Sequence, residues 1–458
     1  MNQDGESRFR LNQPCGSYQL DFDLLKEAIT FHYHPGIINP GSRMKNLKTR
    51  EEKIMQKKLL GALFSRIKGE PFAVTYWDGQ TEVYGADKKK EPAIRMIINE
   101  KLNLKEMLCD PELKFGEAYM DRKIDFEGDL KDIFDLLIKN QDLFKGNKNI
   151  DKILQRFKKS QKETTCGKQA EKVQYHYDLG NDFYKLWLDD TMSYSCAYFR
   201  SPEDSLEQAQ RQKIDHTLRK LQLKEGEYLL DIGSGWGWLI ITAAKEYGAK
   251  ALGVTLSKEQ EQETKRRIAE EGLEGRVEVR LADYRDLAAA GETFDKVVSV
   301  GMFEHVGKDY IPEYFTNLNK MLTDGGISLL HTISRPTEVP PNEWLEKYIF
   351  PWGYIPSVRE VVWQLPEHGF HLLDAESLRM HYSMTTGRWA ENFERVVDRV
   401  EKKYGERFAR MWRLYLVGCS SSFRHSGLDI HQFLFSKGLN NELPLTREYM
   451  YETAGPER

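Results

Sequence analysis

The sequence predicts an α/β fold, a Rossmann-like parallel sheet with helices on both faces, preceded by a smaller α+β domain. From Tyr228 onward, apolar strand segments alternate with segments of helical apolar spacing. One strand runs directly into glycines at alternate positions, in Leu229-Leu-Asp-Ile-Gly-Ser-Gly-Trp-Gly237. Strands are expected at 228–232, 250–255, 276–281, 294–300, 326–331 and 429–439, and helices at 236–247, 257–271 and 309–322.

The glycine segment predicts a ligand held close to the backbone. Gly233, Gly235 and Gly237 follow Asp231, and glycine permits the required dihedral angles and has no Cβ in the way. The spacing G-x-G-x-G differs from the G-x-G-x-x-G of dinucleotide sites. It suits an amino acid joined to adenosine without phosphates, which is S-adenosylmethionine. The alternative is an ordinary glycine-rich turn after a buried strand.

The other expected strand ends supply the rest of this site, because ligands of open α/β sheets lie outside the carboxyl ends of the strands. Five segments are expected to converge there: 233–237, 255–260, 283–285, 301–307 and 331–333. The second strand ends without the acid that usually holds ribose hydroxyls, so these contacts fall to Thr255, Leu256 and Gln260.

The adenine is expected beside the segment that follows the third strand. Asp283 offers a carboxylate to its amino group, and Tyr284 and Arg285 follow at once. The alternative is that Asp283 caps the next helix. Upstream, Tyr194 and Ser195 lie in an aromatic segment that could fold over the sulfonium end of the cofactor.

Composition and charge exclude several classes of protein. A formal net charge of −4 gives no support to a nucleic-acid partner. The five cysteines are widely spaced without a C-x-x-C, which indicates neither a metal site nor a disulfide framework and favours a reducing cytoplasm. No signal peptide and no stretch of 18 apolar residues is apparent, so we expect a soluble or membrane-surface protein.

Five segments are expected along the chain. Residues 1–50 form an extension without an assigned role, 51–144 the small domain, 145–170 a basic linker, 171–440 the catalytic domain and 441–458 a tail. In the small domain we expect helices at 51–67 and 129–143 and a hairpin of Phe72–Trp77 with Thr81–Tyr84. The linker is interpreted either as a solvated helix or as a segment that adsorbs to an anionic bilayer. Between residue 333 and the last strand, a long and largely helical insertion could roof the crevice.

Several motifs together resemble the cyclopropane-fatty-acyl-phospholipid synthases, relatives of the mycolic acid cyclopropane synthases. They are Tyr194-Ser-Cys-Ala-Tyr198, Gly301-Met-Phe-Glu-His-Val-Gly307, Leu330-His-Thr-Ile333, Lys347-Tyr-Ile-Phe-Pro351 and Arg407-Phe-x-Arg-Met411. The resemblance covers about 171–440 and, more weakly, the first domain through Gly116–Asp121. It implies a class I S-adenosylmethionine-dependent methyltransferase domain with a helical cap, after an N-terminal lipid-binding domain.

The resemblance also implies a reaction. The methyl carbon of S-adenosylmethionine is transferred to a cis double bond of a phospholipid acyl chain, and a bound bicarbonate removes the proton whose loss closes a cyclopropane ring. By position, the bicarbonate is held by Cys196, Glu304, His331, Tyr382 and the backbone of Ile333. We expect Glu304 to accept the bicarbonate proton or to orient His331.

Each of these residues also has a structural interpretation. Glu304 could begin a helix, and His331 could be a hydrogen-bonded core histidine. Cys419 matches a cysteine often assigned to the active site of the family, yet the chemistry needs no thiolate, and a buried cysteine among small residues is usually packing. The chain departs from the family at Ser234, where cysteine is usual, and at Trp238, where a smaller residue is usual.

The expected partners are unsaturated phospholipids at the inner leaflet, reached from the cytoplasm, with a homodimer left open. One aromatic-rich segment is interpreted either as the wall of an acyl tunnel or as the ordinary core of the cap. It contains Trp344, Tyr348, Ile349, Phe350 and Trp352. Two rival functions remain: a methyltransferase that leaves a methyl or methylene branch or acts on another acceptor, and a lipid-binding protein with an inactive site.

Overall fold

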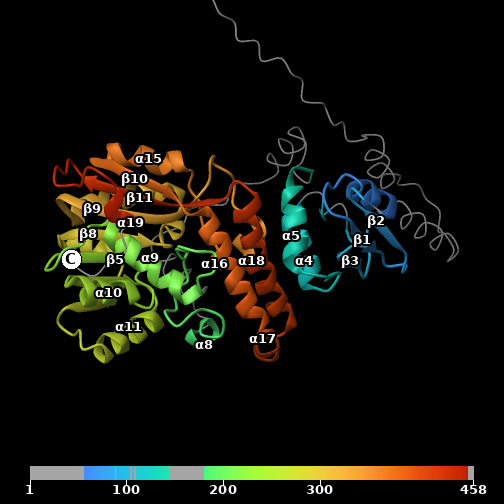
Figure 1. Cartoon of the computed structure of the whole chain (residues 1–458), viewed down its shortest axis with the longest axis horizontal. Helices are drawn as coiled ribbons and strands as arrows, with labels where there is room; N and C mark the ends of the chain where they lie inside the picture. The colour runs from blue at the N-terminus through green and yellow to red at the C-terminus, as the bar shows by residue number, and fades with distance from the viewer. Residues whose placement is uncertain (1–55, 88, 104–105, 108–109, 144–179, 452–458) are drawn as a thin grey trace, which may run out of the picture. The chain divides into compact units, whose positions relative to one another are not determined.

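The computed structural model describes residues 56–87, 89–103, 106–107, 110–143 and 180–451 (Figure 1). The chain divides into two units between Arg66 and Ile67. In the first unit, residues 56–64 are helical, which agrees with the predicted helix. The predicted extension and the basic linker lie outside the described residues.

The small domain contains a four-stranded sheet of order β2-β1-β3-β4. Strands β1 (Phe72–Thr75) and β2 (Thr81–Tyr84) form the predicted antiparallel hairpin, whose turn is closed by the Gly79 N–H donating to Tyr76 O at 2.8 Å. Strands β3 (Ile94–Ile98) and β4 (Ile124–Glu127) were not predicted. Helix α5 (Leu130–Lys139) confirms the expected second helix, and α4 (Pro111–Met120) adds one.

The larger domain is built on a seven-stranded sheet of order β10-β11-β9-β8-β5-β6-β7. Its strands are β5 (Tyr228–Ile232), β6 (Lys250–Thr255), β7 (Val277–Leu281), β8 (Phe294–Val300), β9 (Leu322–Ser334), β10 (Phe370–Ser377) and β11 (Asp429–Lys437). Apolar residues of α9, α10 and α11 pack in one core cluster and those of α12, α13 and α15 in another, both with sheet residues. The predicted α/β class with helices on both faces is therefore confirmed.

The helices of this domain fall into two groups. Those that flank the sheet are α9 (Leu206–Lys220), α10 (Trp238–Tyr247), α11 (Lys258–Glu270), α12 (Tyr284–Ala290), α13 (Ile311–Met321) and α15 (Val358–Glu367). The rest are α8 (Asn181–Tyr184), α14 (Glu343–Tyr348), α16 (Arg379–Glu394), α17 (Val397–Tyr404), α18 (Glu406–His425) and α19 (Glu448–Tyr451), with short 3-10 turns η2 (Phe303–His305) and η3 (Lys308–Tyr310); a further 3-10 turn, η1 (Gln141–Leu143), follows α5 in the small domain. Within the described ranges, none of these helices has the length and apolar character to cross a bilayer.

Three details of the sheet differ from the prediction. Strand β11 is antiparallel to both β9 and β10, so the sheet is not wholly parallel. Strand β10 lies inside the insertion that was expected to be largely helical, and its mostly solvent-accessible sequence FHLLDAES lacks the apolar alternation that would have revealed it. Strand β9 continues to Ser334, so His331 and Ile333 lie within a strand rather than after its end.

The cap helices enclose a core of aromatic side chains. Phe183, Trp187, Trp389 and Trp412 are fully buried, and the Phe183 ring meets the Trp412 ring edge-on with centroids 4.9 Å apart. Such edge-to-face pairs add to the stabilisation that burial itself gives. The predicted helical cap is therefore confirmed, except that the same stretch of chain also contains strand β10.

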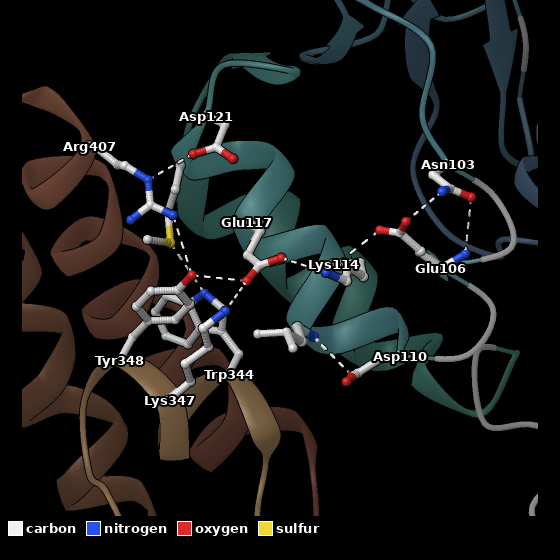
Figure 2. A network of polar contacts seen from close by, with 12 residues as sticks. Asn103, Glu106, Asp110, Lys114, Glu117, Asp121, Trp344, Lys347, Tyr348 and Arg407 are labelled. Carbon is white, nitrogen blue, oxygen red and sulfur yellow. Dashed lines mark hydrogen bonds and ion pairs between the residues drawn. The ribbon is translucent and has the colours of Figure 1, made fainter. Parts of the chain in front are cut away.

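Helix α4 of the small domain is hydrogen-bonded to α14 and α18 (Figure 2). The Glu117 carboxylate accepts from Lys347 Nζ at 2.6 Å and from the Tyr348 hydroxyl at 2.9 Å, and Arg407 Nε donates to Asp121 at 2.8 Å. The Trp344 indole donates to Met120 Sδ at 3.3 Å. Trp344 and Tyr348, two of the five tunnel candidates, therefore face this contact.

The remaining tunnel candidates are dispersed. Ile349 is buried, the Phe350 ring lies 5.8 Å from the Tyr415 ring, and Trp352 is 53% exposed. The structural alternative, that these residues belong to the core of the cap and its edges, accounts for Trp344 and Ile349.

A glycine in α4 permits the close approach of Trp344. A Cβ on Gly116 would lie 2.4 Å from Trp344 Cδ1. We expect Gly116→Ala to lower the free energy of unfolding by about 1–3 kcal/mol, the usual cost of overpacking a core. Gly418→Ala in α18 is the matched control, because its added Cβ would meet nothing closer than 3.9 Å and it gains the same helix propensity. Urea unfolding of the two variants measures the difference, and equal changes would contradict the close contact.

Candidate active site

One cavity opens at the carboxyl ends of β5, β6, β7 and β8. All of the residues predicted to bind the cofactor line it: Tyr194, Ser195, Asp231, Gly233, Gly235, Gly237, Thr255, Leu256, Gln260, Asp283, Tyr284 and Arg285. Four of the five segments predicted to converge therefore do so. The fifth, 331–333, lies inside β9 and does not line this cavity.

The glycine loop adopts backbone conformations that L side chains disfavour. Gly233 and Gly237 both have φ near +85°. A Cβ at Gly237 would also lie 2.3 Å from Thr264 Cγ2, on the buried side of α11. The loop is joined to the next strand by the Gly233 N–H, which donates to Val254 O at 2.9 Å. Glycine is therefore required at these positions both by the positive φ angles and by the close packing around the loop.

The end of β6 is ordered by side chains of its own. The Thr255 hydroxyl donates to Gln260 Oε1 at 2.7 Å, and the Ser257 side chain caps α11 by accepting from the Gln260 N–H. Both Thr255 and Gln260 are buried on the lining of the cavity. Hydroxyl and amide groups thus occupy the position where the family of dinucleotide sites has a carboxylate.

Asp283 performs the structural role that was its alternative interpretation. Its carboxylate caps α12 by accepting from the Arg285 N–H at 3.0 Å, and it pairs with the Arg285 guanidinium at 2.5 Å. Tyr284 lies beside this pair, with the Arg285 guanidinium 5.7 Å from its ring centre. Asp283 can cap α12 and also bind a ligand in the cavity, because its carboxylate oxygens have further lone pairs.

Several further residues line the cavity, of which those on α9 were not predicted and the others lie in the predicted 301–307 segment or at Trp238. Lys213 and Ile214 come from α9, Met302 and His305 from the segment after β8, and Trp238 from the start of α10. Arg267 lies 5.5 Å from the Trp238 ring centre and holds the indole at the wall. Only the apolar spacing of α9 could have indicated these α9 residues, because a lysine on a helix is ordinarily assigned to the solvent face.

The predicted catalytic residues surround the cavity without lining it. Cys196 follows the lining residue Ser195, and Glu304 precedes the lining residue His305. The backbone carbonyl of His331 accepts from the Gly301 N–H at 3.0 Å. Cys196, Glu304 and His331 are therefore one residue or one hydrogen bond away from the lining.

Glu304 is a buried carboxylate with one oxygen engaged. Its Oε1 accepts from the backbone N–H of Ile333 at 2.7 Å, which uses the donor that the resemblance assigned to bicarbonate. Its buried Oε2 has no hydrogen-bond partner among the described residues. Burial raises the pKa of this carboxyl above its ordinary range. Glu304 therefore has a buried oxygen available to accept a proton or a hydrogen bond.

His331 is a buried donor. Gln432 Nε2 lies 3.2 Å from His331 Nδ1, and with the amide donating there, the ring proton is on Nε2. That Nε2 has no partner within the part of the chain that the structure describes. Burial lowers the pKa of His331 to about 3, so the ring is neutral at physiological pH.

Cys196, Tyr382 and Ile333 share one apolar cluster with Leu378 and Phe423. The Cys196 thiol is fully buried, and burial raises its pKa, so it remains protonated. The Tyr382 ring packs on the Phe423 ring with centroids 4.5 Å apart. Cys196 is buried in this cluster, and Tyr382 and Ile333 are partly buried at its edge.

Cys419 lies in α18 against the aromatic core of the cap. Burial raises the pKa of its thiol to about 12, so it is essentially all thiol at neutral pH. We expect Cys419→Ala to keep turnover within about threefold, since a buried thiol acts as a small apolar side chain. Initial rates with saturating substrates measure this. A tenfold loss with an unchanged melting temperature would give the thiol a chemical role.

The sheet order and the glycine loop at its switch point define the class I fold of S-adenosylmethionine-dependent methyltransferases. The family model of mycolic acid cyclopropane synthetase matches residues 164–433. The chain belongs to this family. A second model, a domain of unknown function (DUF7884), matches residues 59–149. The resemblance predicted from the sequence is thereby confirmed.

The relatives carry two kinds of name. A probable fatty acid methyltransferase of Pseudomonas putida is 38% identical over 391 residues, 83% of this chain and 96% of the relative. The cyclopropane-fatty-acyl-phospholipid synthase of Escherichia coli K12 is 42% identical over 273 residues, 59% of this chain and 69% of the relative.

A solved structure supports the same family. The cyclopropane synthase MmaA2 from Mycobacterium tuberculosis has a TM-score of 0.55 and 36% identity, covering 58% of this chain and 98% of that one. The mycolic acid cyclopropane synthase CmaA1, in a complex with S-adenosylhomocysteine (SAH) and CTAB, has a TM-score of 0.55 and 33% identity over the same shares of the two chains.

Proposed function

We propose that this protein is a cyclopropane-fatty-acyl-phospholipid synthase. It takes a methyl carbon from S-adenosylmethionine in the glycine-loop cavity and adds it across a cis double bond of an unsaturated phospholipid acyl chain. The observation that supports a proton-removing step is that Glu304 Oε2 and His331 Nε2 are buried without a hydrogen-bond partner among the described residues, on two residues that adjoin the cavity lining. A ring requires that a proton leave the transferred carbon, and so does a methylene branch; these atoms offer an acceptor and a donor for that step.

The cofactor cavity fits S-adenosylmethionine in its chemistry. Gly233, Gly235 and Gly237 line the cavity, and a Cβ on Gly235 alone of the three would meet no protein atom within 4 Å, so the loop brings backbone to the ligand space. When bound, this cofactor supplies an electrophilic methyl group. The structure of the relative CmaA1 contains SAH, the demethylated cofactor. The residues of this chain contribute binding and orientation, which an isolated alkene needs because it is a weak nucleophile.

The buried pair also fits a small protonated anion. The His331 N–H can donate to an anionic oxygen, and Glu304 Oε2 can accept from its hydroxyl. Bicarbonate bound there would supply a base at the position where ring closure needs one. The Ile333 N–H does not join this set, because Glu304 already accepts from it. We still propose Cys196 and Tyr382 as members of the bicarbonate site, because they pack in one apolar cluster with Ile333.

A second candidate, a methyl- or methylene-branching fatty acid methyltransferase, is favoured by the names of some relatives. The Pseudomonas putida relative is called a probable fatty acid methyltransferase, and a tuberculostearic acid methyltransferase of Mycobacterium tuberculosis is 39% identical over 275 residues. The two candidates share the cofactor and differ in the fate of the transferred carbon.

The acceptor proposed here is a phospholipid at a membrane surface. We propose that the 51–144 domain binds lipid and that the protein lies at the inner membrane leaflet, reached from the cytoplasm. A monomer and a homodimer are both consistent with this role.

Label transfer tests the proposed acceptor. We would incubate the full chain with methyl-labelled S-adenosylmethionine and vesicles of a cis-monounsaturated phospholipid, then count label in the extracted lipid. The matched control is vesicles of a saturated phospholipid with the same headgroup. We expect label only from the unsaturated vesicles. Equal label in both would point to a headgroup acceptor, and no label in either would remove lipid as the substrate.

A further inference from the structure

A lysine inside the larger domain lies at the cofactor cavity without a carboxylate partner. Lys213 on α9 is 4% exposed and lines the cavity. Its ammonium donates to the Ser195 hydroxyl at 3.0 Å. Among the residues that the structure describes, it makes this one hydrogen bond and no ion pair. An ammonium has three donors, so this one has capacity for further acceptors.

The next buried lysine on the same helix shows how such a charge is ordinarily compensated. Lys220, two turns later, is completely buried and forms ion pairs with Asp374 at 3.3 Å and Glu376 at 2.6 Å. Buried charges are normally paired because the loss of hydration is costly. Lys213 has the burial of Lys220 but not its carboxylates.

An unpaired carboxylate lies on the same cavity. Asp231 at the end of β5 is 3% exposed, and its Oδ1 has no hydrogen-bond partner within the described ranges. Burial lowers the pKa of Lys213 to about 8 and raises that of Asp231 to about 7. Desolvation disfavours both charged forms, and the attraction between Lys213 and the carboxylates of Asp189 and Asp231 offsets only part of this cost, so a ligand that carries both charges would offset more.

The position of Ser195 relative to Lys213 is fixed by the same helix. Gln210, one turn before Lys213 and fully buried, donates from Nε2 to the backbone carbonyls of Ser193 at 3.2 Å and Ser195 at 3.0 Å. The Ser195 hydroxyl and the Lys213 ammonium are therefore presented to the cavity as one preorganised unit. Preorganisation of this kind reduces the cost of binding.

We infer that Lys213 binds the α-carboxylate of the methionyl part of S-adenosylmethionine, with the Ser195 hydroxyl as its neighbour. This inference rests on the proposed cofactor. The methionyl end is a zwitterionic amino acid, whose carboxylate suits an unpaired ammonium and whose own ammonium suits Asp231. The adenosine part carries no anionic group, so the carboxylate is the feature of the ligand that a buried cation selects.

Calorimetric titration with two ligands tests this assignment. One is SAH, and the other is its decarboxylated analogue, which keeps the adenosine, thioether and amine. We expect the wild type to bind SAH about 10- to 100-fold more tightly than the analogue, as a charged hydrogen bond between buried groups allows. In Lys213→Gln this preference should fall to about threefold or less, through loss of SAH affinity alone. Lys213→Arg, which keeps the charge, should recover part of the preference.

The control is Arg211→Gln, which removes an exposed cation from the same helix and should keep the wild-type preference. If Lys213→Gln weakens SAH and the analogue equally, Lys213 supports the shape of the cavity and the assignment is overturned. A wild type that binds neither ligand would overturn the cofactor proposal as well, and this outcome is distinct from the first.

Discussion

Glu304→Gln is expected to lower turnover by about 10²- to 10⁴-fold, the usual cost of losing a positioned proton acceptor. The amide is nearly isosteric, and its oxygen can still accept from the Ile333 N–H, as Glu304 Oε1 does at 2.7 Å. The other oxygen, buried and unpartnered within the described part of the chain, becomes an NH₂ that cannot take a proton. Initial rates at saturating S-adenosylmethionine and lipid measure this loss.

Binding of the cofactor should be preserved in the same variant. Glu304 does not line the cofactor cavity, so the SAH affinity of Glu304→Gln should match the wild type within about threefold, a difference of well under 1 kcal/mol. Glu313→Gln, a change of the same kind at an exposed position of α13, is the control for both measurements. Near-normal turnover in Glu304→Gln would remove this carboxylate from the chemistry.

The pH dependence follows from the same burial. Because burial raises the pKa of Glu304, its ionised, proton-accepting form is lost as the pH falls at values above the ordinary carboxyl range. Turnover should therefore decline on the acid side, with a midpoint above the usual glutamate pKa. His331 does not cause this decline, because its pKa of about 3 keeps it neutral throughout. The pH–rate profile of Glu304→Gln should lack the decline, and an unchanged profile would assign it to another group.

Gly237→Ala is expected to weaken SAH binding at least tenfold and to destabilise the protein by about 2–5 kcal/mol. Two costs combine: a φ near +85°, which costs an L residue about 1–2 kcal/mol, and overpacking against a buried threonine. The new Cβ would lie 2.3 Å from Thr264 Cγ2, so the loop or α11 must move. Titration with SAH and urea unfolding measure the two effects.

Gly226→Ala separates strain from site geometry. Gly226 precedes β5 with a φ of +81°, but a Cβ there would meet nothing within 4 Å, and it does not line the cavity. It should carry the dihedral cost with unchanged SAH affinity. If both variants bind SAH as the wild type does, the glycine loop does not approach the ligand.

The lining of the cavity could be predicted residue by residue because its determinants are local. Asp231 and Gly233 lie in or directly after β5, Gln260 lies in the first turn of the helix that follows β6, and parallel strands bring their carboxyl ends to one edge. Lys213 could not be found this way. It enters the cavity from a helix outside the strand-end pattern, and burial of a lysine depends on tertiary packing.

The catalytic set was harder to place than the cofactor set. His331 and Ile333 were expected after a strand end, but β9 continues to Ser334 because its apolar run pairs on both sides, with β8 and β11. The Ile333 N–H was expected to be open to an anion, whereas Glu304 accepts from it. That long-range pairing has no signature in local sequence. Trp344, a candidate either for a tunnel wall or for the core of the cap, packs on Gly116.

The most direct test of the central claim, ring closure on the acyl chain, is proton NMR of fatty esters recovered from unsaturated vesicles after turnover. Mass alone does not serve, because a cyclopropane ring and a methylene branch weigh the same. The account predicts upfield ring protons that grow with time. Vinylidene protons, or a new methyl doublet with no ring signal, would contradict it and identify a branching methyltransferase.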